Sequence, residues 1–473
     1  MTEPARANGP LDVVRATLER HAGLVTAAIF IIALAPRLWV AVRWSGEPVW
    51  DGHYYHFGAE RIATGHGYSD DVATANGLAW HPWCHYPVGY SAFLALFYAI
   101  FGASPTVGTA AGALVGAATA AVVHRLSLQF LGPVRAILAG LFCALHPGLV
   151  LYAAVLMTEP LAAFGLVAAP LVYLSLSTRP RLAAIAAGVV LGLTTLVRPQ
   201  TVLCAPAIAL LVPGGGLRPR LIAGALATVV CLATVGPWTL RNCARMDGCA
   251  FVSTNAGWNL AIGSSPRATG RFEPLRAEDG CKIVTGQVQQ DRCWMDQGKE
   301  WIRADPGRWL ALVPTKLSFT FDHQSFPVGY LSQSAPGAWP EERRAEWRAI
   351  LGVTQYILLL AAALGAVLLP GGRPRHAALA VGLGLALVLF TDGLIREPMR
   401  AWPLAVLLPV LAVLPPFERR DRGIVRYLAY GLFTLLVVHA VFFGEDRYQV
   451  VVTPGLCVLA AAALRWADPR PTV

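Results

Sequence analysis

Apolar runs long enough to cross a lipid bilayer recur along almost the whole chain of 473 residues. A bilayer core about 30 Å thick requires roughly 20 mainly apolar residues in a helix. Hydrophobic residues make up 55% of the chain and charged residues only 14%, whereas soluble proteins carry about 25% charged residues. The sequence therefore predicts an all-α protein that crosses the membrane many times. The net charge of +10 does not indicate nucleic-acid binding, because the arginines lie in short loops between apolar runs.

The positions of these arginines predict the topology, because positive residues accumulate in cytoplasmic loops. Apolar runs begin near residues 23, 87, 106, 136, 158, 181, 199, 217, 349, 376, 401, 423 and 448. The run at 87–102 is short and begins at Pro87, so we expect it to lie along the membrane surface as an interfacial juxtamembrane helix. About 12 transmembrane helices then remain. With this assignment, the basic loops 124–135, 178–181, 218–220, 373–376 and 418–422 all fall on the cytoplasmic side.

The same topology predicts the domain organisation. Residues 1–22 form a cytoplasmic segment, residues 23–465 the transmembrane domain, and residues 466–473 a cytoplasmic tail. The outer side receives the long loops 44–105 and 241–348, the turns at Glu159 and Arg198, and the segments 391–400 and 444–447. The loop 241–348 is the candidate for a small extramembrane subdomain, with a helix break at Pro306 followed by an amphipathic helix.

Four of the nine cysteines lie in the loop 241–348, at Cys243, Cys249, Cys281 and Cys293. On the outer side of the membrane, an oxidising compartment, such cysteines favour disulfides. Three pairings are possible, and the local one joins Cys243 to Cys249 and Cys281 to Cys293. Zinc and free thiols are the alternatives, although no CxxC motif or close histidine pair supports zinc.

Five charged residues stand at the outer edges of apolar spans, where a charge is costly and tends to mark function. They are Asp51, Glu159, Arg198, Arg241 and Arg447. A helical bundle could unite them in one cavity. A carboxylate can accept the proton of an attacking hydroxyl, and arginines can stabilise a departing phosphate. An outward-facing site needs a sugar donor that crosses the membrane, as a polyprenyl carrier does. The structural alternatives are helix caps for the acids and interfacial anchors for the arginines.

Histidines crowd the loop 44–105, so a divalent metal is an open alternative for this region. They are His53, His56, His81 and His85. Their spacing is irregular, and the aromatic residues around them are typical of an interfacial belt. The sequence therefore assigns no definite cofactor and no definite metal site.

The segments that carry these residues together resemble the GT-C superfamily of polytopic glycosyltransferases. The resemblance is greatest to family 39, which holds the protein O-mannosyltransferases and the lipid A aminoarabinose transferases. Residues 51–68 are similar to the first outer loop of that family, and HYPVGYSAFLALFYAIFG to its juxtamembrane helix. LHPGLVLYAAVLMTEPL resembles the second outer motif. LVRP, PWTLRN, VSTNAGWNLAIG and FFGEDRYQVVVTP resemble motifs of bacterial members.

The resemblance implies an inverting enzyme that moves a sugar from a polyprenyl-phosphate donor to a lipid, glycan or protein acceptor. Asp51 matches the catalytic carboxylate and would act as general base, and Glu159 matches the second acidic position. The residues implied to bind the donor phosphate are Arg198, Arg241 and Arg447. The residues implied to line the sugar or acceptor pocket are Tyr55, Asn255 and Asn259.

The resemblance also implies a place in the bacterial cytoplasmic (inner) membrane among membrane lipids, with the active site facing the periplasm and the loop 241–348 as a lid. The sequence departs from both groups of the family. Gly52 follows Asp51 where the protein O-mannosyltransferases have an Asp-Glu pair, and His85-Tyr86-Pro87-Val88 lacks the lysine of the aminoarabinose transferases. The sugar and acceptor therefore stay open. A flippase or transporter and a non-catalytic cell-envelope scaffold are the rival classes, although no inverted repeat supports transport.

Overall fold

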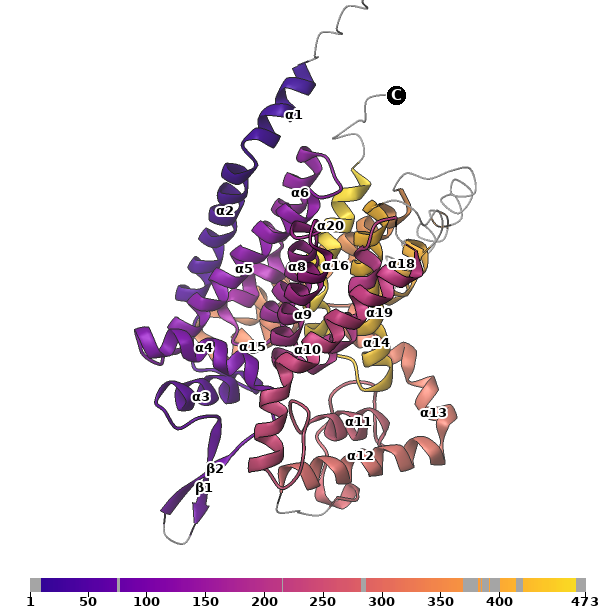
Figure 1. The fold of residues 1–473 in the computed structure, drawn as a ribbon. Helices are drawn as coiled ribbons and strands as arrows, with labels where there is room; N and C mark the ends of the chain where they lie inside the picture. The colour runs from indigo at the N-terminus through magenta and orange to yellow at the C-terminus, as the bar shows by residue number, and fades with distance from the viewer. Residues whose placement is uncertain are drawn as a thin grey trace, which may run out of the picture.

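The computed structural model describes residues 10–74, 77–214, 216–281, 286–368, 400–413 and 420–464, with the single positions 382, 384 and 391. Nearly all regular structure in these residues is helical, as predicted, and one short β-hairpin is the exception. Figure 1 shows a bundle of long helices, with helix α1 (Pro10–Arg20) projecting from one end and a layer of short helices with the hairpin at the opposite end.

The helices of the bundle begin close to the residues that the apolar runs predict. They are α2 (Ala22–Arg43), α5 (Pro105–Ser127), α6 (Pro133–Leu145), α8 (Glu159–Ser175), α9 (Pro180–Val197), α10 (Leu217–Arg245), α16 (Glu341–Leu368), α18 (Trp402–Val413), α19 (Arg420–Val441) and α20 (Thr453–Ala463). The run near residue 199 forms two successive 3₁₀ helices, η2 (Pro199–Cys204) and η3 (Pro206–Leu211). The predicted span near 376, the loop 373–376, the tail 466–473, nearly all of the segment 391–400 and part of the loop 418–422 lie outside the described residues.

Within the described ranges, six helices are long and apolar enough to cross a membrane by themselves, so the protein is an integral membrane protein. A seventh span results if α6 and α7 (Pro147–Leu151), which continues as η1 (Tyr152–Ala154), are counted as one helix bent by 51°. The predicted total of about 12 is compatible with these helices and the shorter apolar ones beside them.

The bend between α6 and α7 follows from Pro147, which disfavours a helical conformation at His146. The break leaves carbonyl groups at the end of α6 without helical partners. The buried Arg37 of α2 donates from Nη2 to the Cys143 carbonyl at 2.9 Å and from Nη1 to the Ala144 carbonyl at 2.5 Å. A charged side chain inside the bundle therefore supplies the hydrogen bonds that these carbonyl groups of the broken helix lack.

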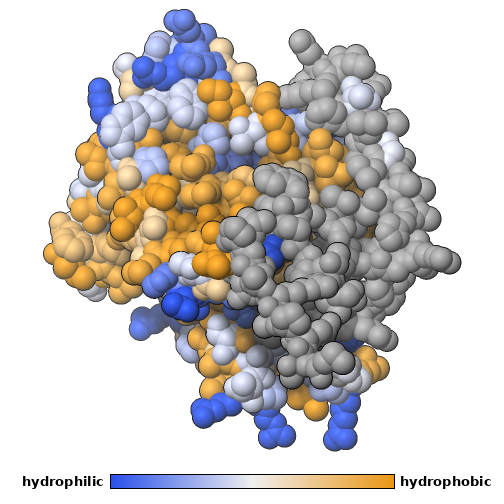
Figure 2. Space-filling model, turned by 90° about the horizontal axis from the view of Figure 1, so that it is seen from above, coloured by the Kyte–Doolittle hydropathy of each residue, from blue (hydrophilic) through white to orange (hydrophobic). Residues whose placement is uncertain are grey.

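The surface of the bundle carries large apolar side chains that a membrane would cover. Figure 2, which looks onto the end of the bundle from which α1 projects, shows hydrophobic residues over much of the described surface, with hydrophilic residues at its upper and lower edges and in smaller groups between them. On α2 and α10 the exposed apolar residues include Leu24, Ile31, Trp39, Leu221 and Val229. Apolar surface of this extent is expected to face lipid.

The predicted first outer loop folds as two short helices with a hairpin between them. Helix α3 (Asp51–Ala63) is followed by β1 (Ser69–Thr74), β2 (Gly77–Pro82) and α4 (Val88–Phe101). The strands are antiparallel, with Ser69 opposite Pro82. Helix α4 is the predicted interfacial helix, and its 14 residues are too few to span a bilayer.

The second long loop forms most of the remaining layer. Its helices are α11 (Ala256–Ser264), η4 (Ala277–Asp279), α12 (Gln287–Ala304), α13 (Pro306–Ala311), α14 (Val313–Phe321), α15 (Phe326–Ser334) and η5 (Pro336–Ala338). The predicted helix break at Pro306 is confirmed, because α12 ends at Ala304 and α13 begins at Pro306. Asp291 of α12 accepts hydrogen bonds from the Gly257 and Trp258 amides and so fixes α12 to α11.

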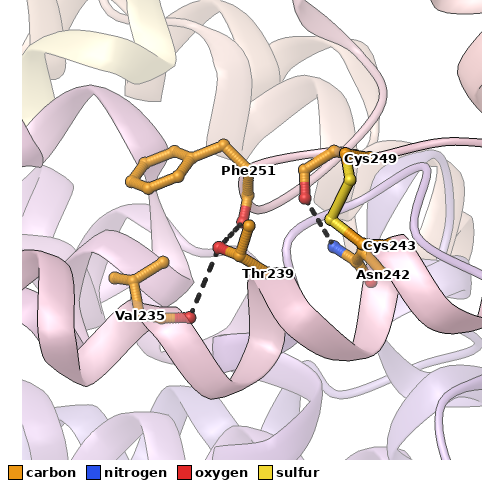
Figure 3. Close-up of a disulfide and its surroundings, with 7 residues drawn as sticks. Val235, Thr239, Asn242, Cys243, Cys249 and Phe251 are labelled. Atoms are coloured by element: carbon orange, nitrogen blue, oxygen red, sulfur yellow. Dashed lines mark hydrogen bonds between the residues drawn. A yellow bond between two sulfur atoms is a disulfide. The ribbon is translucent and has the colours of Figure 1, made fainter.

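Two disulfides stabilise this layer with the local pairing, Cys243–Cys249 and Cys281–Cys293. These four cysteines are thus neither zinc ligands nor free thiols. Figure 3 shows the first disulfide at the end of α10, where the chain turns back along the helix. Close to it, Thr239 Oγ1 donates to the Phe251 carbonyl and Asn242 Nδ2 to the Ala250 carbonyl.

Candidate active site

Asp51 is the first residue of α3, where the amide groups of a helix N-terminus favour a negative charge. Arg447 Nη1 donates to its Oδ2 at 2.6 Å, and the Tyr86 hydroxyl donates to its Oδ1 at 2.8 Å. Burial alone would raise the pKa of Asp51. The charge of Arg447 and the hydrogen bonds from Arg447 and Tyr86 outweigh burial, so the pKa lies below its ordinary value. The carboxylate is therefore ionised at neutral pH and held in one orientation.

Glu159 is the first residue of α8 and is fully buried. Arg198, which directly follows α9, donates from Nη1 to Glu159 Oε1 at 2.6 Å and to the Thr158 hydroxyl at 3.0 Å. A buried carboxylate is tolerated when a charged and hydrogen-bonded partner accompanies it. Arg198 supplies that partner, so the pair forms a fixed ionic contact between the ends of two bundle helices.

Arg447 links these two acids through η6 (Asp446–Val451), which follows α19. Besides its contact with Asp51, its Nε lies 3.8 Å from Glu159 Oε1 and 2.5 Å from Glu445 Oε2. We name the five residues the carboxylate–arginine cluster: Asp51, Glu159, Glu445, Arg198 and Arg447.

The Tyr448 ring supports the two arginines of this cluster. The guanidinium carbons of Arg198 and Arg447 each lie 5.0 Å from the ring centroid. The imidazole of His439 stacks on the same ring with centroids 4.1 Å apart. These contacts hold two positive groups close together, as the binding of one phosphate would require.

The loop before η6 is itself anchored. The Asp446 carboxylate accepts hydrogen bonds from the Ser325 and Phe326 amides at the start of α15. The cluster therefore lies where α3, α8, the end of α9 and the α19–η6 connection meet. Four of the five charged residues that the sequence places at span edges do come together, namely Asp51, Glu159, Arg198 and Arg447.

Arg241 lies elsewhere, and its place does not agree with the predicted role in binding phosphate. Its guanidinium donates to the Tyr68 carbonyl at 2.7 Å and to the Trp83 carbonyl at 3.0 Å, and it packs over the Trp238 ring. These carbonyls flank the hairpin, so Arg241 fixes the hairpin to the end of α10.

The residues predicted to line a sugar or acceptor pocket come from α3 and from the start of α11. Tyr55 is buried in α3, and its ring centroid lies 5.4 Å from that of Tyr86, which binds Asp51. Asn255 precedes α11 and accepts a hydrogen bond from the Ser253 hydroxyl, whereas Asn259 lies within α11 and is partly exposed.

The start of α11 approaches the cluster through His85. The His85 ring lies 4.9 Å from the Tyr86 ring and 5.8 Å from the Trp258 ring, centroid to centroid. Burial lowers the pKa of His85 against the opposing effect of Asp51, so the ring is neutral at pH 7. A neutral imidazole between α11 and the Asp51 partner can exchange hydrogen bonds with a bound hydroxyl.

Glu445 and Tyr86 belong to the site although the sequence pattern alone did not single them out. Glu445 stands two residues before Arg447 in FFGEDRYQVVVTP, and this spacing was the available signal. Tyr86 is one of the aromatic residues around the histidines of the loop 44–105 that are typical of an interfacial belt, and nothing local distinguishes a tyrosine that binds a carboxylate from one that faces lipid.

Within the described part of the chain, no group of three or more His, Cys, Asp and Glu side chains is arranged to hold a metal ion. The His56 ring instead shares a hydrogen bond with the Tyr98 hydroxyl at 2.6 Å. The carboxylates of the cluster are instead paired with arginines.

Residues 85–240 match the family model described as dolichyl-phosphate-mannose-protein mannosyltransferase. The match covers about a third of the chain and includes Glu159 and Arg198. It confirms that the resemblance to GT-C glycosyltransferases seen in the motifs holds for this region. No curated protein gives a match.

Comparison with solved structures gives matches of low similarity. The oligosaccharyltransferase of Archaeoglobus fulgidus, tethered with an acceptor peptide, is 13% identical, with a TM-score of 0.46 over 93% of this chain and 49% of that one. The same organism's AglB in complex with an inhibitory peptide and a dolichol-phosphate is 14% identical, with a TM-score of 0.45 over 96% and 53%. ArnT from Cupriavidus metallidurans, bound to undecaprenyl phosphate, is 16% identical, with a TM-score of 0.38 over 95% and 78%. The chain thus spans about half the length of the oligosaccharyltransferases.

Proposed function

We propose that this protein is an integral membrane glycosyltransferase that moves a sugar from a polyprenyl-phosphate donor to a lipid, glycan or protein acceptor. The observation that carries the proposal is the contact of Asp51 with Arg447 inside a cluster that also holds Arg198. A group able to accept a proton thus lies beside two groups able to hold a phosphate. The family matched by residues 85–240 is described by a lipid-phosphate sugar donor, in agreement with this chemistry.

In the proposed reaction, Asp51 is the general base. Its carboxylate accepts the proton of the acceptor hydroxyl while the hydroxyl oxygen bonds to the anomeric carbon of the sugar. The bond from that carbon to the phosphate oxygen breaks, and the polyprenyl phosphate leaves with the bonding electrons. Direct displacement inverts the anomeric centre.

Arg447 and Arg198 stabilise the negative charge that grows on the leaving phosphate. Their guanidinium groups both pack on the Tyr448 ring, which keeps the two positive charges close together before any ligand binds. Glu159 orients Arg198. Tyr86 orients Asp51, because its hydroxyl donates to the carboxylate oxygen that Arg447 does not contact.

The test is sugar transfer by purified protein from a panel of polyprenyl-phosphate sugars, comparing wild type with Asp51→Asn. Loss of a general base lowers rates by about 10²–10⁴-fold. We expect a loss in this range for Asp51→Asn. The matched control is Asp296→Asn, which changes a carboxylate on α12 with 74% of its side chain exposed and should transfer at the wild-type rate.

The same experiment separates the rival classes. A flippase or transporter would move or bind the lipid without forming a glycosidic bond, and a scaffold would tolerate alanine at Asp51, Glu159 and Arg447. Failure of the wild type to transfer any sugar, in protein that is folded and inserted, would exclude the proposed activity for the tested donors. Equal rates for wild type and Asp51→Asn would exclude Asp51 as the base.

A further inference from the structure

Each guanidinium nitrogen of Arg447 faces a protein partner in the structure described here. Its Nη1 donates to Asp51, its Nη2 donates to the Tyr448 hydroxyl, and its Nε faces Glu445 at 2.5 Å. Nη1 and Nη2 each keep a second N–H, whereas Nε has a single N–H, which makes no hydrogen bond of good geometry. If the donor phosphate binds Arg447 along its Nε edge, the contact with Glu445 is the one exchanged. Two of the three carboxylates of the cluster are poor candidates for the exchange.

Asp51 and Glu159 each have further support besides Arg447. Both are the first residue of a helix, where the helix dipole favours a negative charge. Asp51 also accepts a hydrogen bond from Tyr86, and Glu159 is fully buried against Arg198. Displacing either one would break several favourable contacts at once.

Glu445 has no comparable support. It is the N-cap residue of the short 3₁₀ helix η6, in an extended conformation, but its side chain makes no capping hydrogen bond, and 26% of that side chain is exposed. Its Oε2 has an ion-pair contact with Arg447 and no hydrogen bond of good geometry. Of the three carboxylates, Glu445 can leave Arg447 with the smallest loss of contacts.

The net charge of the cluster also favours the neutralisation of one carboxylate when a phosphate binds. Three carboxylates and two arginines sum to −1 when all are ionised, so an incoming phosphate would raise the negative charge further. Such an accumulation in a partly buried site is unfavourable unless one acid becomes neutral. Protonation of one carboxylate restores the balance.

We propose that the donor phosphate takes the place of Glu445 on Arg447, and that Glu445 binds a proton from solvent as it leaves. Glu445 thus competes with the donor and couples donor binding to the uptake of one proton. This inference rests on the proposed function and assigns a positioning role to a residue that the sequence motifs did not mark.

The electrostatic surroundings of Glu445 agree with proton uptake. Burial raises its pKa to about 7, against the attraction of Arg447 and with the repulsion of Asp446, Asp51 and Glu159. Other charged or titratable groups on packed elements include Arg198 after α9, His439 of α19, and the hydroxyls of Tyr152 and Tyr448, which interact electrostatically with Glu445. Lys316 of α14 binds the last carbonyls of α19 through its Nζ.

The sign of the pH effect follows from this pKa. Below pH 7, Glu445 is already protonated, and the donor binds without proton uptake. Above pH 7, each unit of pH makes the required protonation about tenfold less favourable. Between pH 6 and pH 8, a single group with a pKa of about 7 should weaken binding about tenfold.

The experiment measures the dissociation constant of undecaprenyl phosphate for the detergent-solubilised full chain at pH 6 and pH 8. The wild type is compared with Glu445→Gln, which resembles the protonated acid, and with Glu445→Asp, which keeps a titratable group. The ratio of the wild-type Kd to the Glu445→Gln Kd should be near one at pH 6 and about ten at pH 8. Titration of the phosphate probe affects all variants alike and cancels in this ratio. Glu60→Gln, an exposed substitution on α3, is the matched control and should follow the wild type.

Two failures are distinguishable. If all proteins bind the probe and the ratio of Kd values is the same at both pH values, the exchange at Glu445 is wrong and the proposed function stands. If folded wild type and Glu445→Gln both fail to bind the probe at either pH, the polyprenyl-phosphate donor itself is wrong. A pH effect that Glu445→Asp retains and Glu445→Gln lacks supports the exchange.

Discussion

Trp50 has a backbone conformation that residues with a side chain rarely adopt, with φ 51° and ψ −135°. It lies in a tight turn in which the Gly52 amide donates to the Val49 carbonyl. The ring packs against Phe326 and Tyr330, at centroid distances of 5.3 and 5.9 Å. Strain of this kind costs about 1–3 kcal/mol and persists where surrounding packing enforces it. Because Asp51 follows directly, the strained turn sets the direction from which the carboxylate reaches Arg447.

Replacing Trp50 by glycine and by alanine tests for this strain. Both variants lose the ring contacts, but glycine adopts positive φ freely and alanine does not. We expect Trp50→Gly to be more stable than Trp50→Ala by about 1 kcal/mol, measured by unfolding of the solubilised protein. The matched pair is Tyr54→Gly and Tyr54→Ala within α3, where alanine should be favoured by about 1 kcal/mol. The same order at both positions would contradict strain at Trp50.

The sequence predicts part of this chemistry at the scale of residues. Charged residues at the edges of apolar runs are costly and therefore indicate a function, which singles out Asp51, Glu159, Arg198 and Arg447. Arg241 meets the same criterion yet binds backbone carbonyls, because an arginine at a span edge can fix a hairpin in place as well as bind a ligand. The competition between Glu445 and a phosphate depends on which other groups Arg447 contacts, and only the assembled fold decides that.

At the scale of elements, the contact between α4 and the end of α9 sets the position of Arg198. A Cβ atom on Gly89 would lie 2.5 Å from the Leu196 carbonyl carbon and 2.6 Å from the Val197 amide nitrogen. These backbone atoms cannot move aside as a flexible side chain can. Glycine at this position therefore allows the interfacial helix to rest directly on the segment that carries Arg198.

We expect Gly89→Ala to push α4 away from α9 and to shift Arg198 relative to Glu159. Displacements of about 1 Å in a catalytic arrangement can lower rates by about 10²-fold, so transfer should fall between about ten- and a hundredfold. The control is Gly352→Ala in α16, where no atom lies within 4 Å of the added Cβ. Wild-type transfer by folded Gly89→Ala would show that this contact does not position Arg198.

Hydropathy and charge together predict most elements, because the bilayer imposes a strong constraint on helix length and loop charge. They do not predict the irregular ones. The hairpin of β1 and β2 lies in a polar segment without an apolar run, where hydropathy gives no signal. The bend at Pro147 and the 3₁₀ helices at 199–211 lie inside apolar runs that resemble straight spans. Their backbone groups are satisfied by neighbours such as Arg37, which hydropathy does not detect.

At the scale of the whole molecule, the cysteines bear on the predicted orientation of the protein in the membrane. The five free cysteines, Cys84, Cys143, Cys204, Cys231 and Cys457, are all buried. The Cys243–Cys249 disulfide lies in the layer that borders the proposed site, and Cys249 is exposed. Disulfides persist in oxidising compartments, so this layer is expected to face the periplasm. The short loop between α8 and α9 carries the exposed Ser177 and is expected to face the cytoplasm.

Thiol labelling of intact cells tests this orientation. A membrane-impermeant maleimide should label Cys249 only after mild reduction, and without permeabilising the membrane. In the variant Ser177→Cys, with Cys243 and Cys249 both replaced by serine, labelling should require permeabilisation. The buried free cysteines keep the background low in both cases. Labelling of Ser177→Cys from outside would reverse the orientation and place the cluster on the cytoplasmic side, where nucleotide sugars are available and a donor that crosses the membrane is unnecessary.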